Sequence, residues 1–221
     1  MDSNWEIIGK EGLQFFGKMS ASISHEIKNV LAIINENAGL LEDFTLLAEK
    51  GRPVEMERFK TLAGKIKNQV VRANDIIKNL NRFAHSADAF IEKIDLNEML
   101  GFVVGLSGRL ADMKGVSFEQ KVVDKPVTIT TSPFFLQNLL WFCLEFVMET
   151  ANPDKSVDLL VEKMESGVRI SFSNLLNIEE IQGERFPFPR KEAIMNALGA
   201  QISFDDGKGE LILLLPDDVE H

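Results

Sequence analysis

The chain has 221 residues, enough for one large domain or two small ones, and its 45% share of hydrophobic residues is ordinary for a globular protein. The formal net charge of −10 argues against binding to nucleic acid or to an anionic membrane surface, because both require a basic face. The single cysteine, Cys143, excludes an internal disulfide and suits a reducing cytosol.

We expect no signal peptide at the start of the chain and no membrane span in its most apolar run. The first residues, Met1-Asp2-Ser3-Asn4, are polar and lack the basic region of a signal peptide. The most apolar run, residues 139–148, is far shorter than a membrane span and is interrupted by Glu145. We therefore expect a soluble, cytoplasmic protein that does not itself sense a signal across a membrane.

Residues 5–48 predict a single long helix, because no proline interrupts them. Apolar residues recur within it at alternating steps of three and four, the heptad pattern of a helix that packs along one seam. In this register His25 occupies the position farthest from a partner helix, so its side chain is expected to face solvent. The seam has small or polar interruptions at two positions and consists of Phe16, Ser20, Ile23, Ile27, Val30, Ile34, Asn37, Leu41 and Phe44.

A second helix is predicted over residues 54–85, after a break at Lys50-Gly51-Arg52-Pro53. Two long helices joined by a short connection form an antiparallel hairpin, and each seam is too extensive for the other helix to cover alone. We therefore expect residues 1–88 to form the dimerisation domain of a homodimer, in which two hairpins make a four-helix bundle. The alternative is a monomer whose remaining residues cover the seam. The seam of the second helix consists of Phe59, Ala63, Ile66, Val70, Ala73, Ile77, Leu80 and Ala84.

The residues around His25 offer the groups that phosphoryl chemistry needs. Lys28 and Asn29 share the face of the imidazole at helical spacing, and Glu26 lies on its flank. The cluster contains a nucleophile, a carboxylate that can hydrogen-bond a ring nitrogen, a cation for phosphoryl oxygens and an amide that can orient water. The alternative interpretation is a solvated histidine among solvated charges.

The pattern changes after a linker at residues 87–93. Asp95 predicts a helix start as an N-cap with Glu98 three residues later, and Ser132-Pro133 predicts another. The mixture of helices and strands predicts an α/β sandwich over residues 94–221, and therefore an α+β fold for the whole chain. The helices are expected over residues 95–111, 133–150 and 191–198, and the strands over residues 116–119, 127–130, 157–162, 168–173, 201–204 and 210–215. The aromatic residues expected in its core are Phe102, Phe118, Phe134, Phe135, Trp141, Phe142, Phe146 and Phe172.

The sequence Ser24-His25-Glu26-Ile27-Lys28-Asn29 resembles the H-box of sensor histidine kinases, in which the phosphorylated histidine is followed by an acid and, four residues after the histidine, by Asn or Thr. Val30 departs from the family, which often has Pro and a helix bend there. A helical hairpin followed by an α/β sandwich is also the order of domains in histidine kinases, where the second domain binds ATP. The resemblance covers nearly the whole chain, through its motif in the first part and through its pattern in the second.

The second domain departs from the family at the positions that bind ATP and magnesium. The family's helix Gln-x-x-x-Asn-Leu-Leu-x-Asn-Ala is matched by residues 135–146, and two alignments replace the metal-binding Asn by Glu145 or by Phe142. The family's Asp-x-Gly-x-Gly element is replaced by Asn174-Leu175-Leu176-Asn177-Ile178, and its glycine loop by Phe186-Pro187-Phe188-Pro189-Arg190. The resemblance therefore implies a degenerate, shortened ATPase-like domain whose nucleotide pocket is lost or filled.

A chain with the phosphoacceptor histidine and without an ATP site resembles a histidine phosphotransferase built on a kinase scaffold. The resemblance implies that His25 relays phosphoryl groups between response-regulator aspartates, with Glu26 orienting the imidazole and Lys28 neutralising phosphoryl oxygens. Asn29 is compatible with orienting water for dephosphorylation of a regulator. No cofactor of its own is implied, because magnesium comes with the regulator's acidic pocket.

The expected partner is the receiver domain of a response regulator. Its docking surface is expected on the solvent side of the first helix around His25, with Ile33 and Val71 at the centre and Glu36 on the polar rim. The full set of expected contacts is Ser22, Ala32, Ile33, Glu36, Val71 and Asn74.

Two other functions stay open on the sequence. An ATP-dependent sensor histidine kinase with a divergent pocket would keep the H-box. A non-catalytic dimeric scaffold or antagonist of response regulators would keep the fold while His25 is vestigial. His85 is interpreted as a cation at the end of the second helix, and no group of Cys and His residues has the spacing of a metal site.

Overall fold

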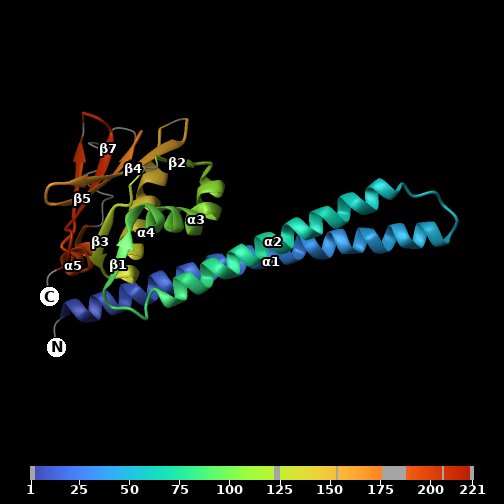
Figure 1. The fold of residues 1–221 in the computed structure, drawn as a ribbon, viewed down its shortest axis with the longest axis horizontal. Helices are drawn as coiled ribbons and strands as arrows, with labels where there is room; N and C mark the ends of the chain where they lie inside the picture. Colours follow the sequence, from blue (N-terminus) through green and yellow to red (C-terminus); the bar gives the residue numbers. More distant parts are fainter. Residues whose placement is uncertain (1–2, 122–124, 153, 176–187, 206, 220–221) are drawn as a thin grey trace. The chain divides into compact units, whose positions relative to one another are not determined.

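The computed structural model of the chain describes residues 3–121, 125–152, 154–175, 188–205 and 207–219 (Figure 1). It confirms the α+β class, because two long helices precede a mixed sheet with its own helices. The chain divides into two compact units, residues 17–83 and residues 1–16 together with 84–221. The start of the first helix therefore groups with the second half of the chain, and the predicted domains 1–88 and 94–221 stay a prediction. Within the described ranges no helix combines the length and the apolar character that a membrane span requires.

Residues 17–83 form a helical hairpin. Helix α1 runs over Ser3–Glu49 and helix α2 over Met56–His85, and the two run antiparallel (Figure 1). Gly51 takes the left-handed conformation with φ of 72°, which suits a residue without a Cβ and reverses the chain after α1. The predicted break at residues 50–53 is thus the turn of the hairpin.

The seam of α1 has the predicted register. Ile23 and Val30 are buried, and Ile27, Ile34 and Leu41 are half-buried. The polar interruption Asn37 is also buried, and its Nδ2 donates a hydrogen bond to the carbonyl of Ile33 at 2.7 Å within the helix. Its amide is thereby satisfied without a partner from another helix.

Within the single hairpin, the buried positions of α2 differ by one residue from the predicted seam at every second position, and the homodimer that the seam was also expected to serve stays a prediction. The structure buries Leu62 where the prediction has Ala63, and it buries Phe83 where the prediction has Ala84. Each pair consists of neighbouring residues, and the larger side chain of each pair faces inward because it removes more apolar surface from water. Ile76 is likewise buried in place of its neighbour Ile77. The outer members of these pairs form an exposed stripe on α2.

The second unit contains two sheets. A five-stranded sheet has the order β2-β4-β5-β7-β6, in which β2 and β4 are parallel and the other neighbours are antiparallel. Strands β1 and β3 form a separate antiparallel pair. The strands are β1 Glu92–Asp95, β2 Ser117–Lys121, β3 Thr128–Thr131, β4 Ser156–Met164, β5 Gly167–Ser173, β6 Gln201–Asp205 and β7 Glu210–Leu215, and the helices are α3 Leu96–Lys114, α4 Pro133–Thr150 and α5 Phe188–Leu198.

Local sequence explains where the helices of this unit begin and end. Asp95 caps α3, because its Oδ1 accepts hydrogen bonds from the backbone N–H groups of Asn97 at 2.8 Å and Glu98 at 3.4 Å. Gly115 ends α3 in the left-handed conformation with φ of 67°. Ser132 occupies the N-cap of α4, but its side chain makes no capping hydrogen bond. Pro133 starts the helix.

The core lies between the sheet and the helices. The inward-facing residues of the central strands are exposed by no more than 3%, and each stabilises the fold by about 1.5–3 kcal/mol. Helix α4 packs its apolar residues against this layer. The inward-facing residues are Val157, Leu159 and Val161 in β4, Val168, Ile170 and Phe172 in β5, and Leu211, Leu213 and Leu215 in β7.

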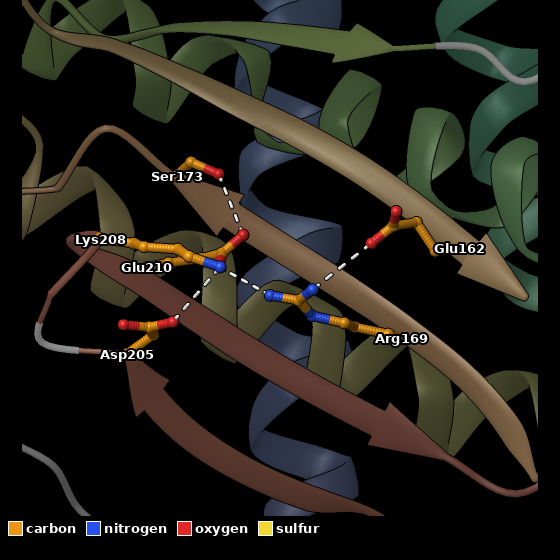
Figure 2. Close-up of polar contacts among 6 residues, drawn as sticks. All are labelled: Glu162, Arg169, Ser173, Asp205, Lys208 and Glu210. Atoms are coloured by element: carbon orange, nitrogen blue, oxygen red, sulfur yellow. Dashed lines mark hydrogen bonds and ion pairs between the residues drawn. The ribbon is translucent and has the colours of Figure 1, made fainter. Parts of the chain in front are cut away.

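The opposite face of the sheet carries a chain of polar contacts (Figure 2). Arg169 on β5 lies 2.7 Å from Glu210 on β7 and 3.5 Å from Glu162 on β4, and the Ser173 hydroxyl donates to Glu210 at 3.3 Å. Figure 2 shows the Arg169 side chain lying between Glu162 and Glu210. These contacts join the central strands on the face that the helices do not cover.

We expect Arg169→Ala to lower the free energy of unfolding by about 1–3 kcal/mol, because it leaves the Glu210 carboxylate, 10% exposed, without its charged partner. Urea denaturation followed by circular dichroism measures this change. The control is Lys208→Ala, since Lys208 is 69% exposed and its pair with Asp205 should contribute less than about 0.5 kcal/mol. Equal effects of the two substitutions would contradict the role assigned to Arg169.

Candidate functional site

His25 lies on a polar face of α1. Its ring is exposed, as are Lys28 and Asn29 one turn further along the helix, while Glu26 on the flank is half-buried. The apolar seam of the same helix is turned into the hairpin, so it anchors the helix without covering the imidazole. The structure thus places the four predicted catalytic residues on consecutive turns of one helix, and their catalytic roles stay a prediction.

The predicted docking residues also lie within the hairpin. The Phe44 and Phe59 rings, with centroids 5.8 Å apart, fix the register of the two antiparallel helices. The same number of residues separates Val71 from Phe59 on α2 as separates Ala32 from Phe44 on α1, so Val71 lies level with Ala32. Asn74 lies one turn further along α2. Of the six predicted docking residues, the exposed ones are Ala32, Glu36, Val71 and Asn74, and the half-buried ones are Ser22 and Ile33.

The exposed imidazole can act as a nucleophile. A neutral histidine ring carries one nitrogen lone pair, and an exposed ring can reach an electrophile on another protein. Lys28 places an ammonium group on the same face, where it can neutralise negative oxygens of a bound phosphoryl group. The arrangement can therefore accept a phosphoryl group from a docked partner.

Helix α4 carries the positions that the sequence aligns with the nucleotide site of histidine kinases. Gln137 and Asn138 are each 1% exposed, and both amides face the protein interior. The Ser86 hydroxyl donates to Gln137 Oε1 at 3.2 Å, and the Lys191 ammonium of α5 donates to Asn138 Oδ1 at 3.1 Å. Both side-chain oxygens are therefore used within the protein.

The two alternative positions of a metal ligand lie in different surroundings. Phe142 is buried, and the Lys191 ammonium lies 5.6 Å from the centre of its ring. Glu145, the other alternative, is half-buried. A cation–π contact of this kind stabilises Lys191 over a hydrocarbon surface and brings no oxygen ligand to the position. In the part of the chain that the structure describes, no three acidic, His or Cys side chains gather as a metal site would require.

The beginning of α1 covers α4 within the same unit. The Phe15 ring lies 5.7 Å from that of Phe134 and 6.3 Å from that of Trp141, centre to centre. A Cβ at Gly12 would lie 3.1 Å from the Phe134 ring, so the absent side chain lets the two helices approach closely. Of the eight aromatic residues predicted in the core, the buried ones are Phe102, Trp141, Phe142, Phe146 and Phe172, and the half-buried ones are Phe118, Phe134 and Phe135.

Asn174 begins the segment that was expected to replace the adenine-reading element of histidine kinases, and its side chain binds neighbouring residues. Its φ of 71° is left-handed, a conformation that Asn tolerates better than most residues. Asn152 Nδ2 donates to Asn174 Oδ1 at 2.6 Å, and Asn174 Nδ2 donates to the Ser156 carbonyl at 2.8 Å. Both ends of the amide thus hold the connection between α4 and β4. Two further predictions concern the replaced element after Leu175 and the lost glycine loop at residues 186–190. Residues 176–187 lie outside the described part of the chain, and residues 188–190 begin α5.

His85 has the character expected of an exposed residue at the end of α2. Its Nδ1 lies 2.7 Å from Asp88 Oδ2, and both side chains are more than 70% exposed. A pair so exposed contributes little to stability.

Sequence comparison finds no protein-family model and no curated protein that matches the chain. Among solved structures, the chain is similar to the catalytic domain of histidine kinase ThkA, with 17% identity, a TM-score of 0.49, and coverage of 58% of this chain and 98% of that one. It is also similar to histidine kinase AdeS of Acinetobacter baumannii, with 12% identity, a TM-score of 0.47, and coverage of 89% and 98%. A third similar structure is ThkA in complex with the response regulator protein TrrA, with 19% identity, a TM-score of 0.46, and coverage of 94% and 64%.

The packing around α4 predicts an inert thiol. Burial raises the pKa of Cys143 to about 12, because the thiolate would lose its hydration. We expect the native protein to resist iodoacetamide at pH 8, and the same thiol to react once denaturant unfolds the chain; mass spectrometry of the alkylated protein measures both. The unfolded thiol ionises at a lower pH than the folded one, so this group lowers stability as the pH rises from the ordinary thiol range toward 12. Rapid alkylation without denaturant would contradict the packing described for α4.

Proposed function

We propose that this chain is a histidine phosphotransfer protein, which relays phosphoryl groups between response-regulator aspartates through His25 and does not bind ATP. The observation that supports the proposal most strongly is the combination of an exposed His25 within an H-box-like sequence and an α4 whose Gln137 and Asn138 side-chain oxygens accept hydrogen bonds inside the protein. A kinase needs both an acceptor histidine and an open nucleotide site. A relay protein needs only the first.

The transfer step follows from the chemistry of the two groups. The Nε2 lone pair of His25 attacks the phosphorus of an aspartyl phosphate, and the bond from phosphorus to the carboxylate oxygen breaks, which frees the carboxylate. The product carries an Nε2–P bond and keeps its proton on Nδ1, where the Glu26 carboxylate favours it. The reverse step delivers the same phosphoryl group to the aspartate of a second regulator.

The neighbours of His25 assist without a cofactor of their own. Lys28 offsets the negative charge of the phosphoryl oxygens, and Asn29 can orient a water molecule if the regulator is to be dephosphorylated. Magnesium enters with the acidic pocket of the receiver domain. The receiver docks on the surface formed by Ser22, Ala32, Ile33, Glu36, Val71 and Asn74.

A homodimer accounts for the exposed stripe of α2. This stripe is apolar at strict spacing of seven residues, and Val70 and Ile77 in its middle are 46% and 44% exposed. A second copy of the hairpin would cover it and complete a four-helix bundle, in which such side chains leave water. The stripe consists of Met56, Ala63, Val70, Ile77 and Ala84.

Replacing His25 tests the relay directly. Receiver domains phosphorylated with labelled acetyl phosphate should pass the label to the purified protein, and His25→Gln should lower this transfer by at least about a hundredfold, because glutamine offers no ring nitrogen. His85→Gln is the matched control and should leave transfer unchanged. Gel autoradiography of the two proteins measures the label.

Two results would decide against the proposal. Incorporation of label from ATP into His25 would identify an ATP-dependent kinase. A stable complex with phosphorylated receivers that transfers no label, although His25 is intact, would identify a scaffold or antagonist.

Adjacent valines separate dimerisation from docking. Val70→Glu should give a monomer, because it places a charge in the stripe that the second copy covers. Val71→Glu should keep the dimer and slow transfer from the receiver by about tenfold or more, because Val71 is 54% exposed at the centre of the docking surface. Light scattering after size exclusion and the label-transfer assay measure the two effects. A dimer in both variants, or in neither, would contradict this division of α2.

A further inference from the structure

The charges of the chain are distributed unevenly between its two compact units. The hairpin of residues 17–83 contains 11 Lys and Arg residues and 8 Asp and Glu residues, a net charge of +3. The rest of the chain contains 13 Lys and Arg residues and 26 Asp and Glu residues, a net charge of −13. Within the hairpin, helix α2 has 7 basic and 2 acidic residues. The net charge of the whole chain therefore conceals one basic helix.

Four cations of α2 have no acidic partner. They are exposed, and in the part of the chain that the structure describes none of them lies within ion-pair distance of an acidic group. By contrast, the Lys191 ammonium of α5 lies 2.9 Å from Glu11 Oε2 of α1. Like charges on one helix do not stabilise it, so the stability of α2 does not explain why they gather here. The four cations are Lys65, Lys67, Arg72 and Lys78.

Lys65 and Arg72 form one column along α2. They lie seven residues apart, and each follows a seam residue, Leu62 or Gln69, by three positions. Three positions turn the helix by about 300°, or about 60° in the opposite sense, whereas the apolar stripe follows the seam by one position, about 100°. The cations and the apolar stripe therefore flank the seam on opposite sides. A second copy that covers the stripe leaves Lys65 and Arg72 in water.

The column runs beside the expected docking surface. By the helix count that places Val71, Arg72 lies six residues and Lys65 thirteen residues beyond the level of His25. These offsets correspond to about 9 Å and about 20 Å along the helix axis. The two cations are therefore too far away to touch a phosphoryl group on His25. They lie within reach of a domain docked there, because a small domain is about 30 Å across.

We propose that Lys65 and Arg72 attract the acidic surface of a receiver domain and steer it onto the hairpin, a role that rests on the proposed relay. The receiver brings the carboxylates that hold magnesium and, once phosphorylated, a further negative charge. A chain with a net charge of −10 repels such a partner, but salt screens charges beyond about 10 Å, so a receiver near the hairpin responds mainly to the cations of α2. Lys67 and Lys78 add to this local positive potential. The column sets the rate of encounter and leaves the chemistry to His25.

Stopped-flow binding measures the encounter without the transfer. The His25→Gln protein accepts no label, and it is mixed with a fluorescently labelled receiver domain phosphorylated by acetyl phosphate in the presence of magnesium. We expect the association rate constant to fall by about tenfold or more as NaCl rises from about 20 to about 300 mM. Adding Lys65→Glu and Arg72→Glu should lower the rate constant at low salt by about tenfold or more and flatten its salt dependence, with a much smaller change in dissociation.

The control places the same change of charge at the turn end of the hairpin. Lys50→Glu with Lys60→Glu reverses two exposed lysines there, and it should leave the association rate constant within about twofold of its starting value. The neutral pair Lys65→Gln and Arg72→Gln should give an intermediate rate constant. This pair also decides the question if the glutamate pair lowers the helical signal in circular dichroism.

Several results would overturn the steering role. Equal rate constants in the Lys65/Arg72 and Lys50/Lys60 glutamate pairs, or a rate constant that does not respond to salt, would show that the column attracts nothing. Equally fast, salt-dependent binding of duplex DNA would identify a surface for polyanions in general.

The relay is judged by separate outcomes. Steered binding without label transfer to an intact His25 would keep the steering role and overturn the relay. Transfer with unsteered binding would do the opposite, and a failure of receivers to bind at any salt concentration would overturn both.

Discussion

The second unit depends on covering α4 from every side. Most side chains of this helix from Pro133 to Thr150 are buried; Phe134, Phe135 and Glu145 are half-buried, and Glu149 is exposed. A sheet can cover only one side of a helix, so other elements must enclose the rest. Helices α3 and α5 and the beginning of α1 do so.

The sequence predicts most of this fold because its signals are local. Asp95, Gly115 and Pro133 mark helix ends through hydrogen bonds and dihedral angles that involve only their neighbours. Alternating apolar residues likewise place β4 and β5 without knowledge of the rest of the chain. The seam of α2 was harder, because Ile76 and Ile77 both fit a heptad and only packing against α1 chooses between them.

The covering role of α1 was missed because it joins residues far apart in the sequence. Glu11 and Lys191 are ordinary charged residues in their local context, and no spacing connects them. A signal was nevertheless available. Ile8, Gly12 and Phe15 are buried at steps of four and three, on a stripe that the seam beginning at Phe16 does not contain. A second apolar stripe at the beginning of a helix indicates a second packing partner.

The candidate site likewise has one part that the sequence predicts and another that only the structure shows. The cluster around His25 could be predicted because it is contained in a few turns of one helix, and its exposure follows from the seam alone. The structural use of Asn174 could not, since it depends on a left-handed backbone and on hydrogen bonds to Asn152 and Ser156. The sequence shows only that Asn174 follows β5, whereas the structure shows which groups its side chain binds.

Burial gives similar side chains opposite roles in this protein. His25 and Lys28 remain in water, where they cost no desolvation and stay available to a partner. Glu11 and Lys191 have left water, and a buried pair of this kind contributes more to the choice of one packing arrangement than to stability, because its attraction is largely offset by lost hydration. Hydrocarbon contacts such as Phe15 with Trp141 pack α1 on α4, and the Glu11–Lys191 ion pair joins α1 to α5. Helix α1 therefore carries the exposed His25 on one of its stretches and packs against α4 with another.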